Sequence, residues 1–471
     1  MQKNLAVAFT LLLAAYTDLP AAELAPNPDR YLQVVRAYAD GMIEHGRDTY
    51  GKVQTPLFAE ALDRRTFKML AGDALKKVRA LTFEEWLIRT NDRMLTGANP
   101  MHCQNLYQVL YALTEITRET RYATEADASL KYFLEHCAGS SGLFYWGEHA
   151  GWDILKDAPI KSNTHEYFRP WVLWDRCWEL APEVCKKHAL GLWTHQITDH
   201  ETGLYSRHAY IEGEKRYPSD APYPRHGGFY VETWAKAYQH TQDAIFLKAI
   251  ETMVDCQERL RTSGGMVIGG NLKSPGTRKA HDVSFAISLW QAAAVLPEPL
   301  AEKLRSTARI NDLPPTDDVQ PVMKSLNIWS GGYGGAGGQI AGPANLFLLR
   351  HHQSQPEKYR ERVLAVADIH LTRPVMLSYP LHPDIFGKVI HLLLGAHDLT
   401  SDTRYLTRAD ELATHALHLF LTDSSPLPKA SHQHDHYEAV TRADSLMMSL
   451  LQLWAAHQKP ARKLPLIYTD R

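Results

Sequence analysis

The sequence predicts an all-α protein: an α/α toroid of helical hairpins that forms a single large domain. Apolar residues recur at helical spacing, as at Leu32, Val35 and Tyr38. A short pattern that joins two helices occurs three times along the chain. Strand-like alternation is scarce, and short strands are expected only at residues 144–146 and 265–269. Helical hairpins repeated through one long chain form a stacked or closed array.

The repeated pattern lies at residues 113–126, 238–249 and 394–409. Each copy contains the end of one helix, a turn with a threonine, an aromatic residue, and an alanine that opens the next helix. The aromatic residues are Tyr122, Phe246 and Tyr405. Short turns between helices place the two helices side by side and antiparallel. We therefore expect the connecting loops to gather at one rim of the toroid and to form a cleft.

Four further helices follow from apolar spacing, at residues 29–46, 82–94, 102–117 and 171–193. Glu166 is expected to open the last of these, because Pro170 is tolerated in a first helical turn. The final helix of the chain is expected to open at residues 437–438.

Composition and charge exclude several classes of protein. The 471 residues are 45% hydrophobic and 22% charged, with a net charge of −2. This is the composition of a soluble globular protein, and it gives no basic field for nucleic acid. No stretch after the N-terminus is long and apolar enough to cross a bilayer.

The first 22 residues have the pattern of a secretory signal peptide. Lys3 precedes an apolar run at residues 5–15, and small residues follow at Ala21 and Ala22. The toroid catalytic domain would then span residues 23–471, in the periplasm or outside the cell. The alternative is an ordinary apolar first helix.

Five cysteines, an odd number, are spread too widely to form a disulfide framework. Most lie in segments expected to be helical, which favours buried, small apolar residues. The pattern leaves open whether one bridge forms.

Three short islands carry the residues best suited to catalysis. They read Trp-Gly-Glu-His at 146–149, His-Glu at 165–166 and Ser-Arg-His at 206–208. His149, Glu166 and His208 are suitable ligands for a divalent cation that accepts both nitrogen and oxygen, such as Mn²⁺. Arg207 would lie beside that ion. The alternatives are a core histidine at 149 and a helix-opening acid at 166.

Substrate contacts are expected around the same islands. Trp146 is either a platform for a sugar ring or a core aromatic residue. A second Arg-His pair, Arg225-His226, would add a planar guanidinium that matches a carboxylate. The residues assigned to substrate binding are Trp146, His165, Arg169, Arg225, His226 and Tyr230.

Two other motifs have simpler explanations. The glycine-rich stretch 331–338 has no preceding strand and no Gly-Lys-Ser/Thr, so it does not indicate a nucleotide loop. The histidines of 432–436 alternate strictly, which is not a zinc pattern. A capping role before the final helix is the simpler interpretation, and a role in the cleft remains open.

The three islands together resemble the family 2 polysaccharide lyases, which are pectate lyases. Those enzymes carry Trp-Gly-Gly-His, then His-Glu-Leu before an aromatic-rich helix, then Asn-Arg-His. Order and spacing agree over residues 145–208. This chain departs from the pattern at Glu148, Tyr167 and Ser206, and nothing outside this stretch aligns.

The resemblance implies an α/α barrel and a Mn²⁺-like divalent cation held by His149, Glu166 and His208. It also implies that Arg207 is the Brønsted base. The expected function is that of a secreted, metal-dependent lyase that cleaves a uronate-containing, pectate-like polysaccharide by β-elimination.

Three alternatives remain open at the sequence level. A glycoside hydrolase would use two carboxylates, for example Glu166 with Asp153 or Asp175. A sugar epimerase on the same scaffold would use paired histidines as acid and base. A non-catalytic protein would bind glycans in the cleft without turnover. An acidic polysaccharide or oligosaccharide is the expected partner, and the sequence does not indicate an oligomeric state.

Overall fold

A computed structural model describes residues 27–470 apart from a few gaps, at 219–221, 262–266, 270–277, 281, 313–327, 331–339, 355 and 423–424. The expected signal peptide and the glycine-rich stretch 331–338 therefore lie outside the described residues.

Most of the described chain is helical. The longer helices are α1 (Pro28–His45), α4 (Gln104–Thr117), α5 (Arg121–His136), α8 (Pro224–Thr241), α9 (Ala244–Leu260), α10 (Val283–Ala293), α11 (Leu300–Ile310), α13 (Ala341–Ser354), α14 (Glu357–Thr372), α15 (Pro383–Thr400), α16 (Thr403–Phe420) and α17 (Ala443–Ala456). Shorter ones are α2 (Gly72–Arg79), α3 (Phe83–Trp86), η2 (Thr90–Asp92), α6 (Trp174–Leu180), α7 (Pro182–Gly191), η3 (Leu192–Gln196) and η4 (Ala439–Thr441).

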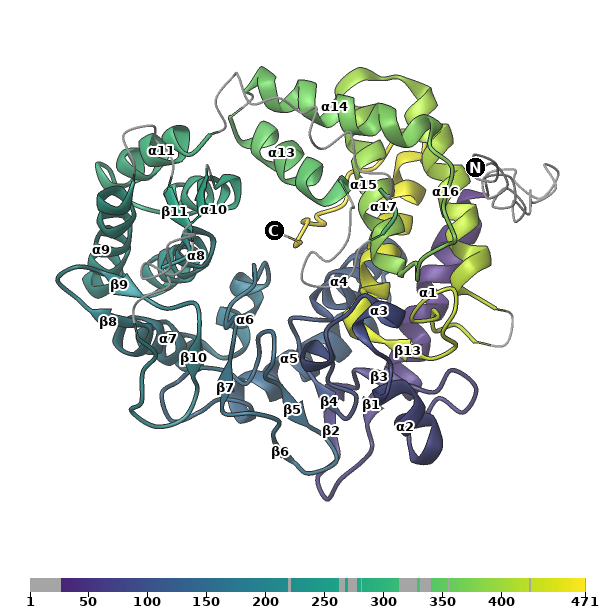
Figure 1. The fold of residues 1–471 in the computed structure, drawn as a ribbon, viewed down its shortest axis with the longest axis horizontal. Coiled ribbons are helices and arrows are strands. Elements are labelled where there is room, and N and C mark those ends of the chain that lie inside the picture. Colours follow the sequence, from purple (N-terminus) through teal and green to yellow (C-terminus); the bar gives the residue numbers. More distant parts are fainter. Residues whose placement is uncertain are drawn as a thin grey trace, which may run out of the picture.

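These helices form a closed ring of hairpins, which confirms the predicted α/α toroid (Figure 1). An inner layer runs through α4, α8, α10, α13, α15 and α17, and successive members pack on one another except between α4 and α8. There α6 completes the ring, because it contacts both α5 and α8. The circle closes where α17 packs on α4, and α1 packs on both of these helices.

The repeated turn has one structure in all three copies. Thr117, Thr241 and Thr400 each donate a hydrogen bond from Oγ1 to the carbonyl four residues earlier, at 2.7–2.8 Å. Each Oγ1 also accepts the backbone N–H two residues later at 3.2 Å. The residue after each threonine adopts a left-handed conformation that ends the helix. The aromatic residue of each copy is buried. The sequence repeat thus encodes the hairpins α4–α5, α8–α9 and α15–α16.

Short strands tie the loops together. They are β1 (Arg47–Asp48), β2 (Thr55–Phe58), β3 (Ala61–Leu62), β4 (Gly97–Ala98), β5 (Trp152–Asp153), β6 (Ala158–Pro159), β7 (Asn163–Thr164), β8 (Ile197–Asp199), β9 (Leu204–Tyr205), β10 (Ala209–Tyr210), β11 (Val267–Gly269), β12 (Arg278–Ala280) and β13 (Tyr437–Glu438). The pairs are β1–β2, β7–β10, β8–β9, β11–β12 and β3–β13, and β4–β5–β6 form a three-stranded sheet.

Residues 144–146 form no strand, because Phe144 makes only an isolated bridge to Ala138. Three predictions about helices were also wrong. The helix expected at 82–94 ends at Trp86, where a left-handed Leu87 stops it. The helix expected to open at Glu166 begins only at Trp174, and Pro182 starts a second helix. Residues 437–438 form strand β13, so the final helix opens later.

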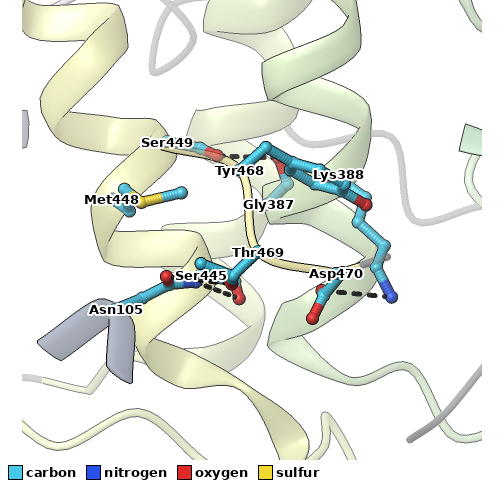
Figure 2. A pocket seen from close by; sticks show the side chains of 9 residues that line it. All are labelled: Asn105, Gly387, Lys388, Ser445, Met448, Ser449, Tyr468, Thr469 and Asp470. Carbon is cyan, nitrogen blue, oxygen red and sulfur yellow. Dashed lines mark hydrogen bonds and ion pairs between the residues drawn. The ribbon is translucent and has the colours of Figure 1, made fainter. Parts of the chain in front are cut away.

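The end of the described chain enters the ring between α15 and α17 (Figure 1). Asp470 forms ion pairs with Arg442 at 3.1 Å and with Lys388 at 3.4 Å. Thr469 donates a hydrogen bond to Asn105, and Figure 2 shows this segment lying against the inner helices. The C-terminal segment therefore lies inside the ring, where these contacts hold it against the inner helices.

All five cysteines are buried and unbridged. Burial raises the pKa of Cys137, Cys177, Cys185 and Cys256, which suits small apolar residues rather than reactive thiols. Within the described part of the chain, no helix combines the length and apolar character that a membrane span requires.

Candidate functional site

Two of the three islands meet through the strand pair β7–β10. Thr164 lies opposite Ala209, and the backbone N–H of Tyr167 donates to the carbonyl of Arg207 at 3.0 Å. His165 and Glu166 follow one strand, while Arg207 and His208 precede the other. The short sheet therefore brings these four residues together.

Gly147 brings in the first island. Its φ of +106° is rarely adopted by other residues, and a Cβ there would lie 2.6 Å from the carbonyl oxygen of Glu166. This close approach lets the N–H of Glu148 donate to that same carbonyl at 2.9 Å. The glycine of the Trp-Gly-Glu-His motif is thus needed for the backbones to meet.

Glu166 lies at the centre of a group of cationic side chains. Its Oε1 is 2.5 Å from Arg207 Nη1, and both carboxylate oxygens are 3.1 Å from Arg225 Nη2. Arg169 Nη2 lies 3.5 Å away, and the buried His226 Nε2 lies 3.6 Å away. Burial alone would raise the pKa of Glu166, but His226 and the arginines outweigh it and hold the pKa far below its usual range.

Glu148 is a second buried carboxylate beside the first. It pairs with Arg89, accepts a hydrogen bond from His165 Nδ1 at 2.8 Å, and lies 3.5 Å from Arg169. Burial opposes ionisation here too. The hydrogen bond from His165 and the guanidinium groups nevertheless lower the pKa of Glu148 to about 2, against the repulsion of Glu166.

His165 links the two carboxylate neighbourhoods in one defined tautomer. Its Nδ1–H donates to Glu148, so Nε2 must accept from Arg207 Nη2, 3.1 Å away. The ring of His208 lies 4.5 Å from that of His165 between centroids, and the ring of His149 lies 5.5 Å from it on a nearly parallel plane. Burial is the main cause that lowers the pKa of His208 to about 4, and the charge of Arg207 acts in the same direction.

The loop before β4 adds an acid that the islands did not indicate. Asp92 is fully buried, and its Oδ1 lies 2.9 Å from Nε2 of His149. Its Oδ2 accepts from Arg89 Nε at 2.8 Å. The pairing of β4 with β5 places this loop beside His149.

The predicted metal ligands are close to one another but are not gathered on one point. Among the described residues, two groups have donor atoms that all lie within 4.8 Å of one another: Asp92, Glu148 and His149, and Glu148, His165 and Glu166. The predicted set of His149, Glu166 and His208 is divided between them, and His208 belongs to neither. Glu148 belongs to both, although the sequence marked it only as a departure from the family pattern.

Three residues assigned to substrate binding are buried instead. Trp146 is 0% exposed and packs among Phe133, Phe144 and other core aromatic rings, so it is no sugar platform. His226 is also 0% exposed and lies behind Glu166. Tyr230 is buried, and its hydroxyl donates to the carbonyl of Ser206 at 3.1 Å. Tyr230 therefore holds the loop that carries Arg207 through this hydrogen bond, and its side chain is not accessible to a substrate.

The other assigned residues remain accessible. The exposed fractions of the side chains are 37% for His165, 34% for Arg225 and 18% for Arg169. Arg207 is 16% exposed, and its guanidinium lies 4.1 Å from the ring of Tyr223. Of the residues assigned to substrate binding or to the base, an incoming ligand would therefore meet the His165 imidazole and three guanidinium groups, with His149 partly exposed beside them.

The histidines of 432–436 do not join this site. His434 bonds to Ser431 at 2.7 Å and His436 to Glu438 at 3.0 Å, and both rings pack on the buried Trp86. Their contacts are those of a structural cluster.

The sequence missed Arg89 and Asp92 and misjudged Glu148. Arg89 and Asp92 fell inside the segment expected to be helical, where polar residues suggest a solvated face. A signal was available in the polar run Arg-Thr-Asn-Asp-Arg at 89–93. This run lies soon after a complete capping box at Thr82, which marks the start of a helix, and it could have indicated that the helix is short.

Residues 69–257 match the sequence model of a family described as periplasmic pectate lyase. The match contains all three islands and the Asp92 loop, and it confirms the resemblance drawn from the islands. It supports an enzyme that acts on polysaccharide.

Several solved structures are similar to this chain at low identity. A D-mannose isomerase is 10% identical, with a TM-score of 0.46 over 93% of this chain and 99% of its own. An unsaturated glucuronyl hydrolase specific for heparin is 12% identical, with a TM-score of 0.43 over 92% and 99%. The cellobiose 2-epimerase from Bacillus thermoamylovorans is 8% identical, with a TM-score of 0.46 over 90% and 99%. At these levels the likenesses carry no argument about activity.

Proposed function

We propose that this protein is an exported, metal-dependent polysaccharide lyase that cleaves a uronate-containing, pectate-like polymer by β-elimination. The observation that supports this most is the arginine group around Glu166, inside the segment that matches the pectate lyase family. In such a reaction a base removes the proton on the carbon next to the uronate carboxylate. The glycosidic oxygen on the following carbon then leaves, and a carbon–carbon double bond forms.

The exposed cations provide the means to hold the substrate. Arg169 and Arg225 each present a planar fork that matches a carboxylate in two hydrogen bonds. Both side chains approach Glu166 from different elements, Arg169 after β7 and Arg225 in the first turn of α8. A uronate carboxylate would exchange with Glu166 as their partner.

Arg207 is the proposed base. An arginine is normally protonated, so its use needs burial and neighbouring cations that favour the neutral form. The side chain is 16% exposed, and Arg225 shares its partner Glu166. His165 fixes one edge of the guanidinium by accepting from Nη2, which leaves the base in one orientation.

A divalent cation such as Mn²⁺, when bound, would neutralise the substrate carboxylate and stabilise the enolate-like charge. The set His149, Glu166 and His208 stays a prediction, and this arrangement does not favour it. Both oxygens of Glu166 already face guanidinium groups, and His208 is in neither donor group.

A glycoside hydrolase is less compatible with these residues. Hydrolysis needs one carboxyl group that stays protonated as a general acid. The pKa values of Glu148 and Glu166 are both lowered. Of the other named acids, Asp175 is 66% exposed and pairs with Lys236 away from the site. Asp153 lies in β5, where it accepts backbone N–H groups at 3.0–3.2 Å.

A sugar epimerase is the second candidate, because three imidazole rings lie in contact at the cleft. It predicts activity on neutral sugars and no response to chelators. The lyase predicts the opposite on both counts.

The test is absorbance at about 235 nm, the band of an unsaturated uronate, on a panel of acidic polysaccharides with and without Mn²⁺. An increase that depends on the enzyme supports elimination. Turnover of neutral sugars without this band would instead support the epimerase.

Export is part of the proposal and has its own measurement. N-terminal sequencing of the native protein should place the first residue near Ala22 or Glu23. A chain that begins at Met1 would contradict it.

A further inference from the structure

Two buried atoms of the candidate site face each other without a hydrogen bond. Asp92 Oδ1 and His149 Nε2 are 2.9 Å apart, yet neither has a hydrogen-bond partner among the described residues. The Asp92 side chain is 0% exposed. A buried carboxylate oxygen without such a partner is costly unless another group satisfies it.

The spacing of these atoms suits two ligands of one ion. Donor atoms at about 2.1 Å from a six-coordinate cation lie about 3 Å from each other in neighbouring positions. Glu148 Oε2 adds a third donor, 3.8 Å from His149 Nε2. One nitrogen and two carboxylate oxygens form a donor set suited to Mn²⁺ and similar divalent ions.

The surrounding contacts hold the two acids in place. Arg89 binds both: its Nε donates to Asp92 Oδ2, and its Nη2 pairs with Glu148 Oε1. Asp92 Oδ1 and Glu148 Oε2 are the carboxylate oxygens nearest His149, and Glu148 Oε2 also accepts a hydrogen bond from His165 Nδ1 at 2.8 Å. Outer partners of this kind orient ligands in metal sites. His149 is 18% exposed, so an ion can reach the site from solvent.

We infer that this chain binds a divalent cation through Asp92, Glu148 and His149. Glu148 occupies the position of a glycine in the pectate lyase motif, and it supplies one ligand of the ion. Glu166 is not a ligand and pairs with the arginines instead. The binding itself does not depend on the reaction, whereas the role of the ion in elimination rests on the proposed function.

This site is tested by titrating the full-length protein with Mn²⁺ in the absence of substrate. Calorimetry and electron paramagnetic resonance measure the binding. Asp92→Asn and Glu148→Gln should each weaken Mn²⁺ binding at least about 100-fold. Loss of a residue that only orients a ligand weakens metal binding by about 10–100-fold, so loss of a ligand should reach or exceed the top of that range. Glu166→Gln and His208→Gln are the matched controls and should change the affinity by less than about tenfold.

A second measurement uses the unaltered protein, so it holds even where a variant fails to fold. Electron spin-echo spectra of bound Mn²⁺ count the imidazoles attached to the ion. The inferred site contains one, from His149, whereas the set His149, Glu166 and His208 contains two.

Two bound imidazoles, or loss of binding in Glu166→Gln with retention in Asp92→Asn, would overturn the inference. So would the absence of Mn²⁺ binding at millimolar concentrations. Mn²⁺ bound at the inferred site without any unsaturated product would leave this inference intact and refute the proposed lyase.

Discussion

Acid should destabilise this protein through histidines that are buried in neutral form. His188 is the clearest example: its ring is fully buried and stacks on Phe144 at 4.3 Å, beneath the first island. Burial lowers its pKa to about 3, although its Nδ1 bonds to the carbonyl of Gly142 at 3.2 Å. Below the ordinary value of 6.5, the unfolded chain binds a proton here that the folded chain does not.

The sign and size of the effect follow from these two pKa values. The contribution of His188 to stability is complete above the unfolded pKa of 6.5 and is lost as pH falls toward about 3. Between about pH 7 and about pH 5 the loss is about 2 kcal/mol for this one group. His370 is buried in the same way with a pKa of about 3, so it should contribute a similar amount.

Urea unfolding at the two pH values measures the effect, and His188→Phe isolates it. Phenylalanine keeps the stacked ring but cannot titrate, and it loses a hydrogen bond worth about 1 kcal/mol at either pH. The variant should therefore lose about 2 kcal/mol less than the parent between about pH 7 and about pH 5. Replacement of His45, whose side chain is 43% exposed, is the control and should leave the difference unchanged. An equal loss in His188→Phe and the parent would refute the reasoning.

The remaining predictions concern the site. Arg207→Lys should lower kcat by about 10²–10⁴-fold, the range for a lost general base, because lysine cannot place its ammonium where the fixed guanidinium edge lies. Arg225→Lys should mainly raise KM, and the reverse pattern in steady-state kinetics would exchange their roles. EDTA should abolish the absorbance at about 235 nm and Mn²⁺ should restore it; full activity in metal-free protein would exclude a metal-dependent lyase. Gly147→Ala should cost about 1–3 kcal/mol of stability in thermal unfolding, with loss of turnover, because its Cβ would meet the Glu166 carbonyl at 2.6 Å; unchanged values would contradict the close approach.

The hairpins could be predicted because local chemistry encodes them. The threonine at each turn bonds back to its own helix and forward to the next, so the signal lies within a few residues. The strand at 437–438 could not be predicted in this way. It exists because it pairs with β3, more than 370 residues earlier, and no local pattern records that contact.

The loops of the site were predicted better than the roles of their side chains. Residue types alone do not distinguish a tryptophan in the core from one on a rim, and Trp146 proved fully buried. The burial of His226 and Tyr230 likewise depends on how α8 packs under the loops. Asp92 became part of the site only through the β4–β5 pairing, which joins segments more than 50 residues apart.

The distribution of charge explains how two kinds of ligand can share this cleft. Near Glu166, Arg169, Arg207 and Arg225 outnumber one carboxylate, so this end favours an anion. Near Arg89 the balance reverses, because Asp92 and Glu148 both pair with this one guanidinium while Arg169, which lies 3.5 Å from Glu148, is shared with Glu166, so that end favours a cation. His165 joins the two ends through one tautomer, with Arg207 on one nitrogen and Glu148 on the other. A uronate carboxylate bound between the ends would therefore meet guanidinium groups on one side and the inferred ion on the other. Glu148→Gly would remove one of the two acids near Arg89 and with it that asymmetry. The glutamate that replaces the second glycine of the pectate lyase motif is therefore central to how charge is distributed in this site.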